Sequence, residues 1–292
     1  MSNVFLLQVH QDTDQLRTLI SILSNDCDVF IHFDKKQCSK TLSDWIDNNC
    51  FTYKVSLIKS RVKVYWAHES QIYATLNLIK EARSYSNYKF YTLLSGDCFP
   101  VKPVSEYIQF LSDNPSKNFI KTIISDKYCY RILLYHFGLK SNYYRKYLIF
   151  RKMSLFLGYV YSIFIKREQF VYGDIGKGSQ WFTLNNDFIS YLFDNNKIES
   201  YEEKIKNTNC IDEMFFQSLL LNSPFKKSIV NNNLRYIKWD GRKSPGIINE
   251  NDLELCSDVF FCRKVSFTLS PSLKKIFLEK VFTRDTDLLP VD

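Results

Sequence analysis

The chain has 292 residues, of which 45% are hydrophobic and 24% charged, and its net charge is +8. These values are typical of a globular protein with one large domain or two small ones, and they exclude a disordered or low-complexity chain. No apolar run reaches the roughly 18 to 20 residues of a membrane-spanning helix, so the sequence predicts no spanning segment.

The cysteines and the N-terminus bear on the cellular compartment. The eight cysteines are scattered, without a C-x-x-C pair or a zinc-finger spacing. The first seven residues lack the basic and long apolar regions of a signal peptide. Together these features predict free thiols in a reducing environment and therefore a cytoplasmic protein.

The first part of the chain alternates buried strands with helices. Strands are predicted at 4–10, 28–33 and 51–58, with helices between them. This β-α-β-α-β order predicts an α/β fold with a mostly parallel central sheet and helices on both faces. Ligands of such sheets bind beyond the carboxyl ends of the strands, and His10, Asp34 and Arg61 lie at such ends.

A long helix at 68–84 and a fourth strand at 88–94 follow, and then the turn 95–100. This turn contains Gly96 and Asp97 directly after a buried strand. Glycine and aspartate in a turn allow the backbone to approach a ligand closely. A further helix is predicted at about 104–114.

The segment 117–170 holds most of the positive charge. It has eleven Lys or Arg residues and two acids, an excess larger than the net charge of the whole chain. Within it, thirteen mostly apolar residues at 153–165 lie between two basic pairs. Two interpretations remain open: a helix in the interface of an anionic membrane, or a buried core helix. No motif in the segment supports nucleic-acid binding.

The remaining elements are a glycine-rich turn and strand at 176–184, a helix from about 186, strands at 233–239 and 259–264, and a helix from 271. Between them, a helix is predicted to begin at Asp212. Met214, Phe215, Ser218 and Leu219 would form its core-facing stripe. Asp212 and Glu213 have two interpretations: acids in a first helical turn, which oppose the helix dipole, or a general base held at the rim of a site.

Seven short motifs occur in order along residues 4–265. They are VFIHFDKK at 29–36, Arg61 with VYW at 64–66 and Ser70, LSGDCFP at 94–100, GSQWF at 178–182, DEMFF at 212–216, LRYIKW at 234–239 and FFCRK at 260–264. In this set the chain resembles the core 2/I-branching N-acetylglucosaminyltransferase and peptide xylosyltransferase family, glycosyltransferase family 14. The resemblance is greatest to short bacterial members, which lack the membrane anchor and stem of the animal enzymes.

The resemblance implies one GT-A-type, Rossmann-like domain over 1–292. We divide it into a nucleotide-binding half at 1–115, a basic and apolar insertion at 117–170, and an acceptor and catalytic half at 171–292. A membrane-facing position of the insertion is one of the two interpretations given above for its apolar stretch. The family inverts the anomeric configuration without a metal, so no metal and no other cofactor is expected. Two Asp-x-Asp triplets, at 12–14 and 285–287, lie outside the position at which metal-dependent GT-A enzymes bind their ion.

The resemblance also assigns roles to residues. Glu213 matches the catalytic base. The expected donor-binding residues are His10, Asp34, Arg61, Gly96, Asp97, Arg242, Lys243, Arg263 and Lys264. The expected acceptor-binding residues are Tyr130, Arg131, Ser179, Trp181, Asp212 and Trp239, although a core role for Trp181 fits equally well. The sequence departs from the family at Cys98, where many members have aspartate, so the choice of donor sugar here can differ.

These observations predict an inverting glycosyltransferase at the inner face of a bacterial membrane. It would move GlcNAc or xylose from UDP-GlcNAc or UDP-xylose to a glycan or lipid-linked saccharide, in surface polysaccharide or lipooligosaccharide synthesis. The expected partners are this donor, this acceptor and an anionic membrane surface, with no nucleic acid. Two alternatives remain open: an inactive module that binds nucleotide sugars or anionic surfaces, and a metal-dependent transferase of another family.

Overall fold

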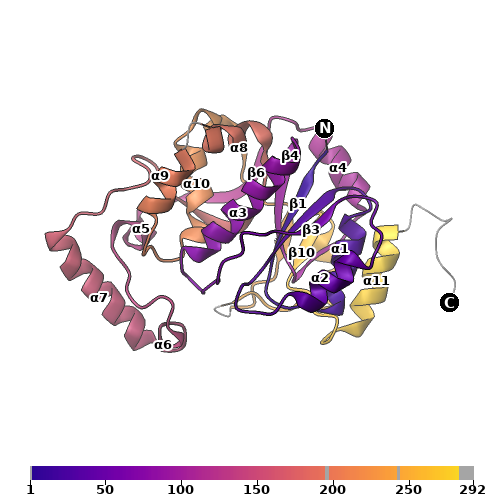
Figure 1. Cartoon of the computed structure of the whole chain (residues 1–292), viewed down its shortest axis with the longest axis horizontal. Helices are drawn as coiled ribbons and strands as arrows, with labels where there is room; N and C mark the ends of the chain where they lie inside the picture. The colour runs from indigo at the N-terminus through magenta and orange to yellow at the C-terminus, as the bar shows by residue number, and fades with distance from the viewer. Residues whose placement is uncertain (1, 195–196, 242–243, 283–292) are drawn as a thin grey trace.

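The computed structural model describes residues 2–194, 197–241 and 244–282. A seven-stranded sheet with the order β3-β2-β1-β4-β7-β6-β8 forms its centre (Figure 1). The strands are β1 (Val4–Val9), β2 (Asp28–Phe33), β3 (Val55–Leu57), β4 (Phe90–Ser95), β6 (Asn118–Ile124), β7 (Gly176–Asn185) and β8 (Ile229–Val230). Four neighbouring pairs are parallel, and only β7 runs antiparallel to its two neighbours. The predicted α/β fold with a mostly parallel sheet is therefore confirmed.

Helices cover both faces of this sheet. Consecutive side chains of a strand point to opposite faces, so each buried strand contributes apolar residues to both layers of helices. In β1, Phe5 and Leu7 belong to one apolar cluster, whereas Val4 and Leu6 belong to another. The first cluster includes residues of α1 (Asp14–Leu23), α2 (Lys40–Asp47), α4 (Val104–Ser112) and α11 (Pro271–Phe282). The second includes residues of α3 (Ser70–Tyr85), α8 (Asn186–Phe193), α9 (Lys197–Lys204) and α10 (Phe215–Leu221).

A small second sheet joins the C-terminal part of the chain to the end of β4. Its order is β5-β10-β9, from β5 (Cys98–Pro100), β10 (Phe261–Arg263) and β9 (Arg235–Ile237). The buried Arg235 donates hydrogen bonds to the carbonyl oxygens of Leu93 (2.8 Å) and Phe182 (3.1 Å) in the central sheet. These bonds give Nη2 of the buried guanidinium its partners and fix the two sheets to each other, although Nε is buried without a partner among the described residues.

The segment 117–170 is not an insertion over its whole length. Its first part, β6, lies between β7 and β8 in the central sheet, so the chain leaves the sheet only after Ile124. The rest, residues 125–170, is called the arm below. It contains the 3₁₀ turn η1 (Asp126–Tyr128), α5 (Tyr130–Leu133), α6 (Asn142–Lys146) and α7 (Leu148–Phe164). Figure 1 shows α6 and α7 projecting from the body of the molecule.

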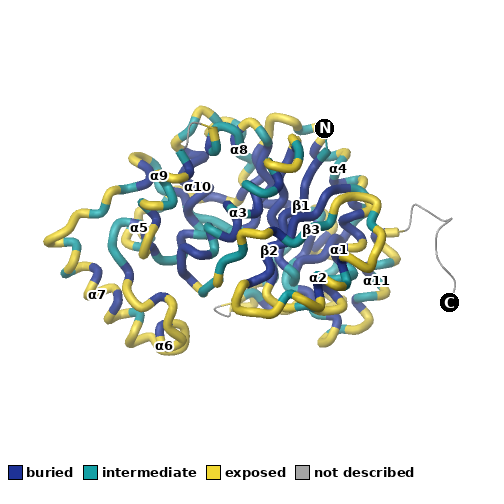
Figure 2. The backbone as a smooth tube through the Cα atoms, viewed as in Figure 1, coloured by how far each residue is buried: buried dark blue, intermediate teal, exposed yellow. Residues whose placement is uncertain are grey.

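The arm decides between the two interpretations of the apolar stretch 153–165. Of the seventeen residues of α7, only Ser154 and Gly158 are buried, and most of the helix is exposed in Figure 2. A core helix is therefore excluded. Across the described ranges, no helix combines the length and the apolar character that crossing a bilayer requires.

Candidate active site

Several of the predicted donor residues lie at the carboxyl edge of the parallel strands, next to β1. At this strand the order reverses, because β1 lies between β2 and β4 and the chain crosses to opposite sides of it. Ligands of open α/β sheets bind at such a point. His10 is exposed directly after β1, and Gly96 lies beside Val9 in the turn after β4. The residues that the sequence predicts from strand ends are thus close together.

Asp34 and His32 together hold the segment that contains Arg61. The Asp34 carboxylate accepts hydrogen bonds from the backbone N–H groups of Lys36 (2.9 Å) and Val64 (3.3 Å). His32 Nε2 accepts one from the N–H of Val62 (3.0 Å). Burial lowers the pKa of His32 to about 4, so this ring is neutral and can act as the acceptor. The two side chains fix the wall against which a donor would lie.

Arg61 has an unused donor in this wall. Its Nη1 is buried and has no hydrogen-bond partner among the residues that the structure describes. Leaving a charged N–H buried without an acceptor is costly, and such groups usually mark a site for a ligand or for water. Arg61 is therefore suited to an anionic group.

Arg263 joins the second sheet to this edge. Its Nη1 donates a hydrogen bond to Ser95 Oγ and lies 3.5 Å from Asp97 Oδ2. Its guanidinium carbon lies 4.6 Å from the ring centre of Trp181, which is 8% exposed. The core role of Trp181 agrees with its burial, and its ring also supports a cation of the site, whereas its contact with an acceptor stays a prediction.

The structure gives less information about the other predicted donor cations, Lys264, Arg242 and Lys243. Lys264 is half-buried after β10, and its backbone carbonyl accepts a hydrogen bond from the N–H of Ile248 (2.8 Å). Arg242 and Lys243 lie outside the described residues.

Glu213 lies in a 3₁₀ turn, η3 (Ile211–Glu213), which precedes α10. The sequence predicts one α-helix that begins at Asp212. The predicted beginning is wrong, because the α-helix begins only at Phe215. Cys210 has the left-handed φ of 49°, and Met214 has φ −134°, outside the α-helical range, so the turn and the helix are separate. The predicted core stripe is confirmed, since Met214, Phe215, Ser218 and Leu219 are all buried.

Two cations hold the Glu213 carboxylate, whose side chain is 38% exposed. Arg131 Nη1 donates to Oε2 at 2.9 Å, and Lys177 Nζ lies 3.6 Å from the same oxygen. Both cations also lie over the ring of Tyr128, at 4.8 Å and 4.7 Å from its centre. The hydrogen bond from Arg131 goes to Oε2, and within the described residues no hydrogen bond to Oε1 is found, so this oxygen can accept one from a hydroxyl group.

Lys177 and Tyr128 are site residues that the sequence reasoning missed. Lys177 lies at the start of β7, whose pairing with β6 shifts register between Gly178 and Phe182. Because of this irregularity, simple alternation from the predicted residues Ser179 and Trp181 does not identify Lys177. No sequence signal identifies Tyr128, because it reaches the site through the arm.

Asp212, a predicted acceptor contact, is half-buried beside Glu213. Its Oδ1 is buried without a hydrogen-bond partner in the described part of the chain. Burial raises the pKa of Asp212 to about 7, and the neighbouring charge of Glu213 adds to the effect. The two adjacent acids thus have different environments, and the role of Asp212 toward an acceptor stays a prediction.

The remaining predicted acceptor residues surround Glu213 and the second sheet. Tyr130 is 39% exposed beside Arg131, and Trp239 is 64% exposed after β9. Ser179 lies on β7, where its Oγ accepts a hydrogen bond from the N–H of Trp181 (3.3 Å). An exposed tryptophan offers a face to a sugar ring. The structure brings Tyr130, Arg131 and Glu213 together at one place, and Trp239 lies on a separate loop.

A chain of amides joins the donor side to the Glu213 side. Gln180 Nε2 donates to Gln8 Oε1 (2.7 Å), and Gln8 Nε2 donates to Gln71 Oε1 (3.1 Å). Gln180 lies between Ser179 and Trp181 on β7, and Gln8 lies near the end of β1. The bonds fix β7 against β1, so the base and the donor wall have a defined relative position. Among the described residues, no three His, Cys, Asp or Glu side chains are grouped as a metal site would require.

Comparisons with known proteins agree with the resemblance seen in the motifs. The Core-2/I-Branching enzyme family matches residues 3–255. A β-1,3-galactosyl-O-glycosyl-glycoprotein β-1,6-N-acetylglucosaminyltransferase 4 from Mus musculus is 22% identical over 98% of this chain and 66% of its own length. Xylosyltransferase 2 from Canis lupus familiaris is 25% identical over 82% of this chain and 26% of its own length. The chain thus spans about two thirds of the first relative and about a quarter of the second.

Among solved structures, HddC from Yersinia pseudotuberculosis, complexed with GMP-PN, matches with a TM-score of 0.31 and 14% identity. The match covers 65% of this chain and 79% of HddC. A TM-score this low supports no comparison of sites. The family match, in contrast, extends over most of the chain and includes β1, the Glu213 turn and β9. The chain therefore belongs to the Core-2/I-Branching enzyme family, whose relatives named above are N-acetylglucosaminyl- and xylosyltransferases.

Proposed function

We propose that this chain is an inverting, metal-independent glycosyltransferase of the GT-A type. It transfers GlcNAc or xylose from a UDP-sugar to a hydroxyl group of a glycan and forms a β-linkage. The observation that carries the proposal is the Glu213 carboxylate, which is 38% exposed and is held through Oε2 by Arg131 and Lys177. The family match and the transferases among the relatives support this reaction class.

Glu213 acts as the general base in this proposal. The acceptor oxygen attacks the anomeric carbon of the sugar from the face opposite UDP, and the hydroxyl proton passes to Glu213 Oε1. The bond between the anomeric carbon and the β-phosphate oxygen breaks, and its electron pair leaves with UDP. One displacement inverts the configuration, so an α-linked donor gives a β-linked product.

Fixed cations balance the charge that develops on the departing diphosphate. Arg263 lies beside Ser95 and Asp97 at the end of β4, and Arg61 has a buried Nη1 without a partner in the described residues. Lys264 follows Arg263 on the same strand end. Preorganised cations aimed at a leaving group stabilise the transition state without reorganisation. Asp34 and the segment that it holds would border the uracil.

The test of the base is the rate of transfer by Glu213→Gln. UDP release from UDP-GlcNAc and UDP-xylose is measured in the presence of an acceptor, with purified full-length protein. We expect the rate to fall by about 10² to 10⁴, because the amide cannot accept the proton. Glu203→Gln is the matched control, since Glu203 is exposed and pairs with Lys206. Equal rates for wild type and Glu213→Gln would refute the assignment and favour an inactive binding module.

The proposal that fixed cations replace a metal ion is tested in the same assay with EDTA, which removes divalent metals. We expect full turnover with EDTA and no gain from Mn²⁺. Loss of turnover with EDTA and recovery with Mn²⁺ would show a metal-dependent transferase and contradict this part of the proposal.

We also propose that the arm holds the enzyme on the anionic inner face of a bacterial membrane, beside a lipid-linked acceptor for surface polysaccharide. Ile149, Phe156 and Ile163 are 67%, 65% and 65% exposed. Their spacing of seven residues places them on one side of α7, opposite the buried Ser154 and Gly158. Exposed basic residues accompany this apolar side, namely Arg145, Lys146, Lys152 and Lys166. An apolar stripe with basic neighbours suits an anionic lipid interface.

Vesicle sedimentation tests this attachment. The contacts of the arm restrict which arginines can bind lipid, because Arg151 donates to the carbonyl of Tyr144 and Arg167 to that of Lys204. The appropriate variant therefore replaces Arg145, Lys146, Lys152 and Lys166 with serine. We expect wild type to sediment with phosphatidylglycerol vesicles but not with phosphatidylcholine vesicles, and the variant to lose most of this binding. Unchanged binding by the variant would contradict the proposal.

A further inference from the structure

We propose a second binding site, for a neutral saccharide unit, at the amino-terminal edge of the central sheet. A pocket of about 410 Å³ lies there, within the usual size range of small-molecule sites. Its walls come from residues just before β1, β2 and β4, from the end of β7 and from α4. β1 has six residues, so this edge is roughly 20 Å from the edge with Asp34 and Ser95. Neither the predicted donor residues nor the predicted acceptor residues line it.

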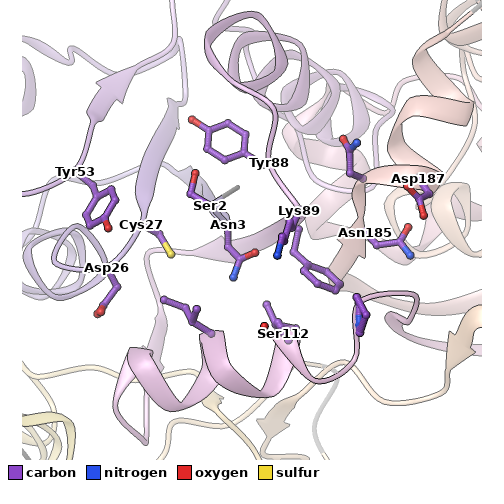
Figure 3. A pocket seen from close by; sticks show the side chains of 15 residues that line it. Ser2, Asn3, Asp26, Cys27, Tyr53, Tyr88, Lys89, Ser112, Asn185 and Asp187 are labelled. Atoms are coloured by element: carbon purple, nitrogen blue, oxygen red, sulfur yellow. The ribbon is translucent and has the colours of Figure 1, made fainter.

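The pocket combines an apolar wall with directed polar groups. Cys27, Phe90, Ile108 and Leu111 supply the apolar part. Figure 3 shows Asn3, Lys89 and Asn185 at the strand ends, with Ser112 on the helix that faces them. Carbohydrates present C–H faces and hydroxyl edges, so they need both kinds of surface.

Two buried amides in this wall have unused hydrogen-bonding capacity. Asn3 is only 8% exposed, lies in the middle of the pocket in Figure 3, and its side chain has no hydrogen-bond partner within the described ranges. Asn185 is 2% exposed, and its Oδ1 accepts from the N–H of Phe188 (3.0 Å), which leaves its NH₂ group as a donor. Neither amide is among the buried side-chain atoms that lack a partner, so solvent reaches their unpaired groups and a ligand in the pocket can reach them as well. The two amides therefore point to a ligand with several hydroxyl groups.

The charges of the lining exclude a phosphorylated ligand. Lys89 is the cation of the lining, whereas Asp26 and Asp187 are acids. A nucleoside diphosphate or a phospholipid headgroup would meet net negative charge there and would be repelled. Tyr53, which is 40% exposed at the rim, adds an aromatic surface that suits a sugar ring. The chemistry therefore fits one or two uncharged sugar residues.

The test measures binding of defined uncharged sugars to the full chain by saturation-transfer NMR. The probes are the methyl glycosides of glucose, galactose, xylose and N-acetylglucosamine, together with cellobiose and N,N′-diacetylchitobiose. Two variants address the pocket: Asn3→Leu removes the amide, and Ser112→Trp fills the mouth from an exposed position on α4. Asn87→Ala is the matched control, because Asn87 is exposed next to the lining residue Tyr88 but does not line the pocket.

We expect at least one probe to bind, with affinity at least tenfold weaker in Asn3→Leu and Ser112→Trp and unchanged in Asn87→Ala. Binding should also persist in Glu213→Gln, so the result does not depend on the proposed reaction. Ser112→Trp decides the matter if Asn3→Leu does not fold, since its thermal unfolding can be compared with that of wild type. No binding by any probe, unchanged binding in Ser112→Trp, or displacement of the sugar by inorganic phosphate would overturn the proposal.

Discussion

Two apolar helices of this chain have opposite environments. All seven residues of α10 are buried against the central sheet, whereas α7 has seventeen residues and buries only Ser154 and Gly158. Both helices are rich in large apolar side chains. They differ in how much of this apolar surface the neighbouring elements cover. α10 packs against β7 and β6, and the arm holds α7 away from the sheet (Figures 1 and 2).

The contact that α7 does make explains why its other sides remain exposed. A Cβ atom at Gly158 would lie 2.0 Å from the carbonyl oxygen of Tyr135, and Ser154 Oγ accepts a hydrogen bond from the N–H of Phe137. The helix thus approaches the rest of the arm most closely at two small residues, where Tyr161 also packs on Tyr135 and Phe137, and most of its other large side chains are exposed. Exposed apolar patches of this kind usually mark a surface that another molecule or a membrane covers.

Truncation of one phenylalanine in each helix gives the largest difference between them. Phe216 in α10 is 2% exposed, and its ring centre lies 4.7 Å from that of Phe182. We expect Phe216→Ala to lower the free energy of unfolding by about 3 to 5 kcal/mol, because a cavity remains in the core. Phe156→Ala in α7 should change it by less than about 0.5 kcal/mol, because that side chain is 65% exposed. Urea denaturation followed by circular dichroism measures both. Equal losses would mean that α7 is covered in solution.

Asp212→Asn gives a smaller effect with a defined dependence on pH. Since the folded protein raises the pKa of Asp212 from 3.8 to about 7, its stabilising contribution is complete below pH 4 and is lost as the pH rises toward 7. Asparagine has no charge to bury. We therefore expect the stability of the variant, relative to wild type, to increase from pH 4 to pH 8 by roughly 1 to 4 kcal/mol.

The matched control for this prediction is Asp44→Asn, at an exposed position in α2. Its stability relative to wild type should not follow the same course. Urea titrations at several pH values measure both differences, and contributions from the buried histidines cancel because every variant retains them. A flat difference for Asp212→Asn would show that the Asp212 carboxyl is already charged in the folded protein at acidic pH.

Much of α10 and of the donor edge can be predicted from the sequence, because two simple geometric rules apply to them. Local spacing decides which residues of a helix share a face, and the strands of a parallel sheet end at one edge. The buried stripe from Met214 to Leu219 and the proximity of Asp34 to Arg61 follow from these rules. The same rules fail at β6, because its residues lie in a segment with a high charge and its last residues are exposed. They fail at α7 as well, because an apolar helix fits a core and an interface equally.

The cations at Glu213 lie beyond the reach of sequence reasoning for another reason. Arg131 comes from the first helix of the arm and Lys177 from the start of β7, on either side of α7 in the chain. Only the folded structure brings them to one carboxylate oxygen. Motif matching finds Glu213 and Arg131 separately, but it does not show that they form an ion pair.

Lys177→Met gives the smallest effect and tests whether the two regions are linked. Tyr128 and Arg131 form the root of the arm, and they meet Lys177 and Glu213 at the entrance to α10. The root of the exposed region thus helps to position the proposed base. Removing the ammonium group leaves Glu213 Oε2 with Arg131 alone, so we expect kcat to fall by about tenfold, since small misplacements of a catalytic group are costly. The KM for the donor should not change, because Lys177 contacts the proposed base Glu213 and not the proposed donor residues.

Lys177→Arg separates this positioning role from a purely structural one. It retains a cation over Tyr128 and should recover most of the lost kcat, whereas Lys177→Met should retain its thermal stability, because the side chain is 23% exposed and its ion pair is partly solvated. A loss of stability in Lys177→Met that matched its loss of rate would indicate a structural contact only. Recovery of kcat by arginine would show instead that the cation acts on the base. The root of the arm would then serve catalysis while α7 remains free to bind a surface.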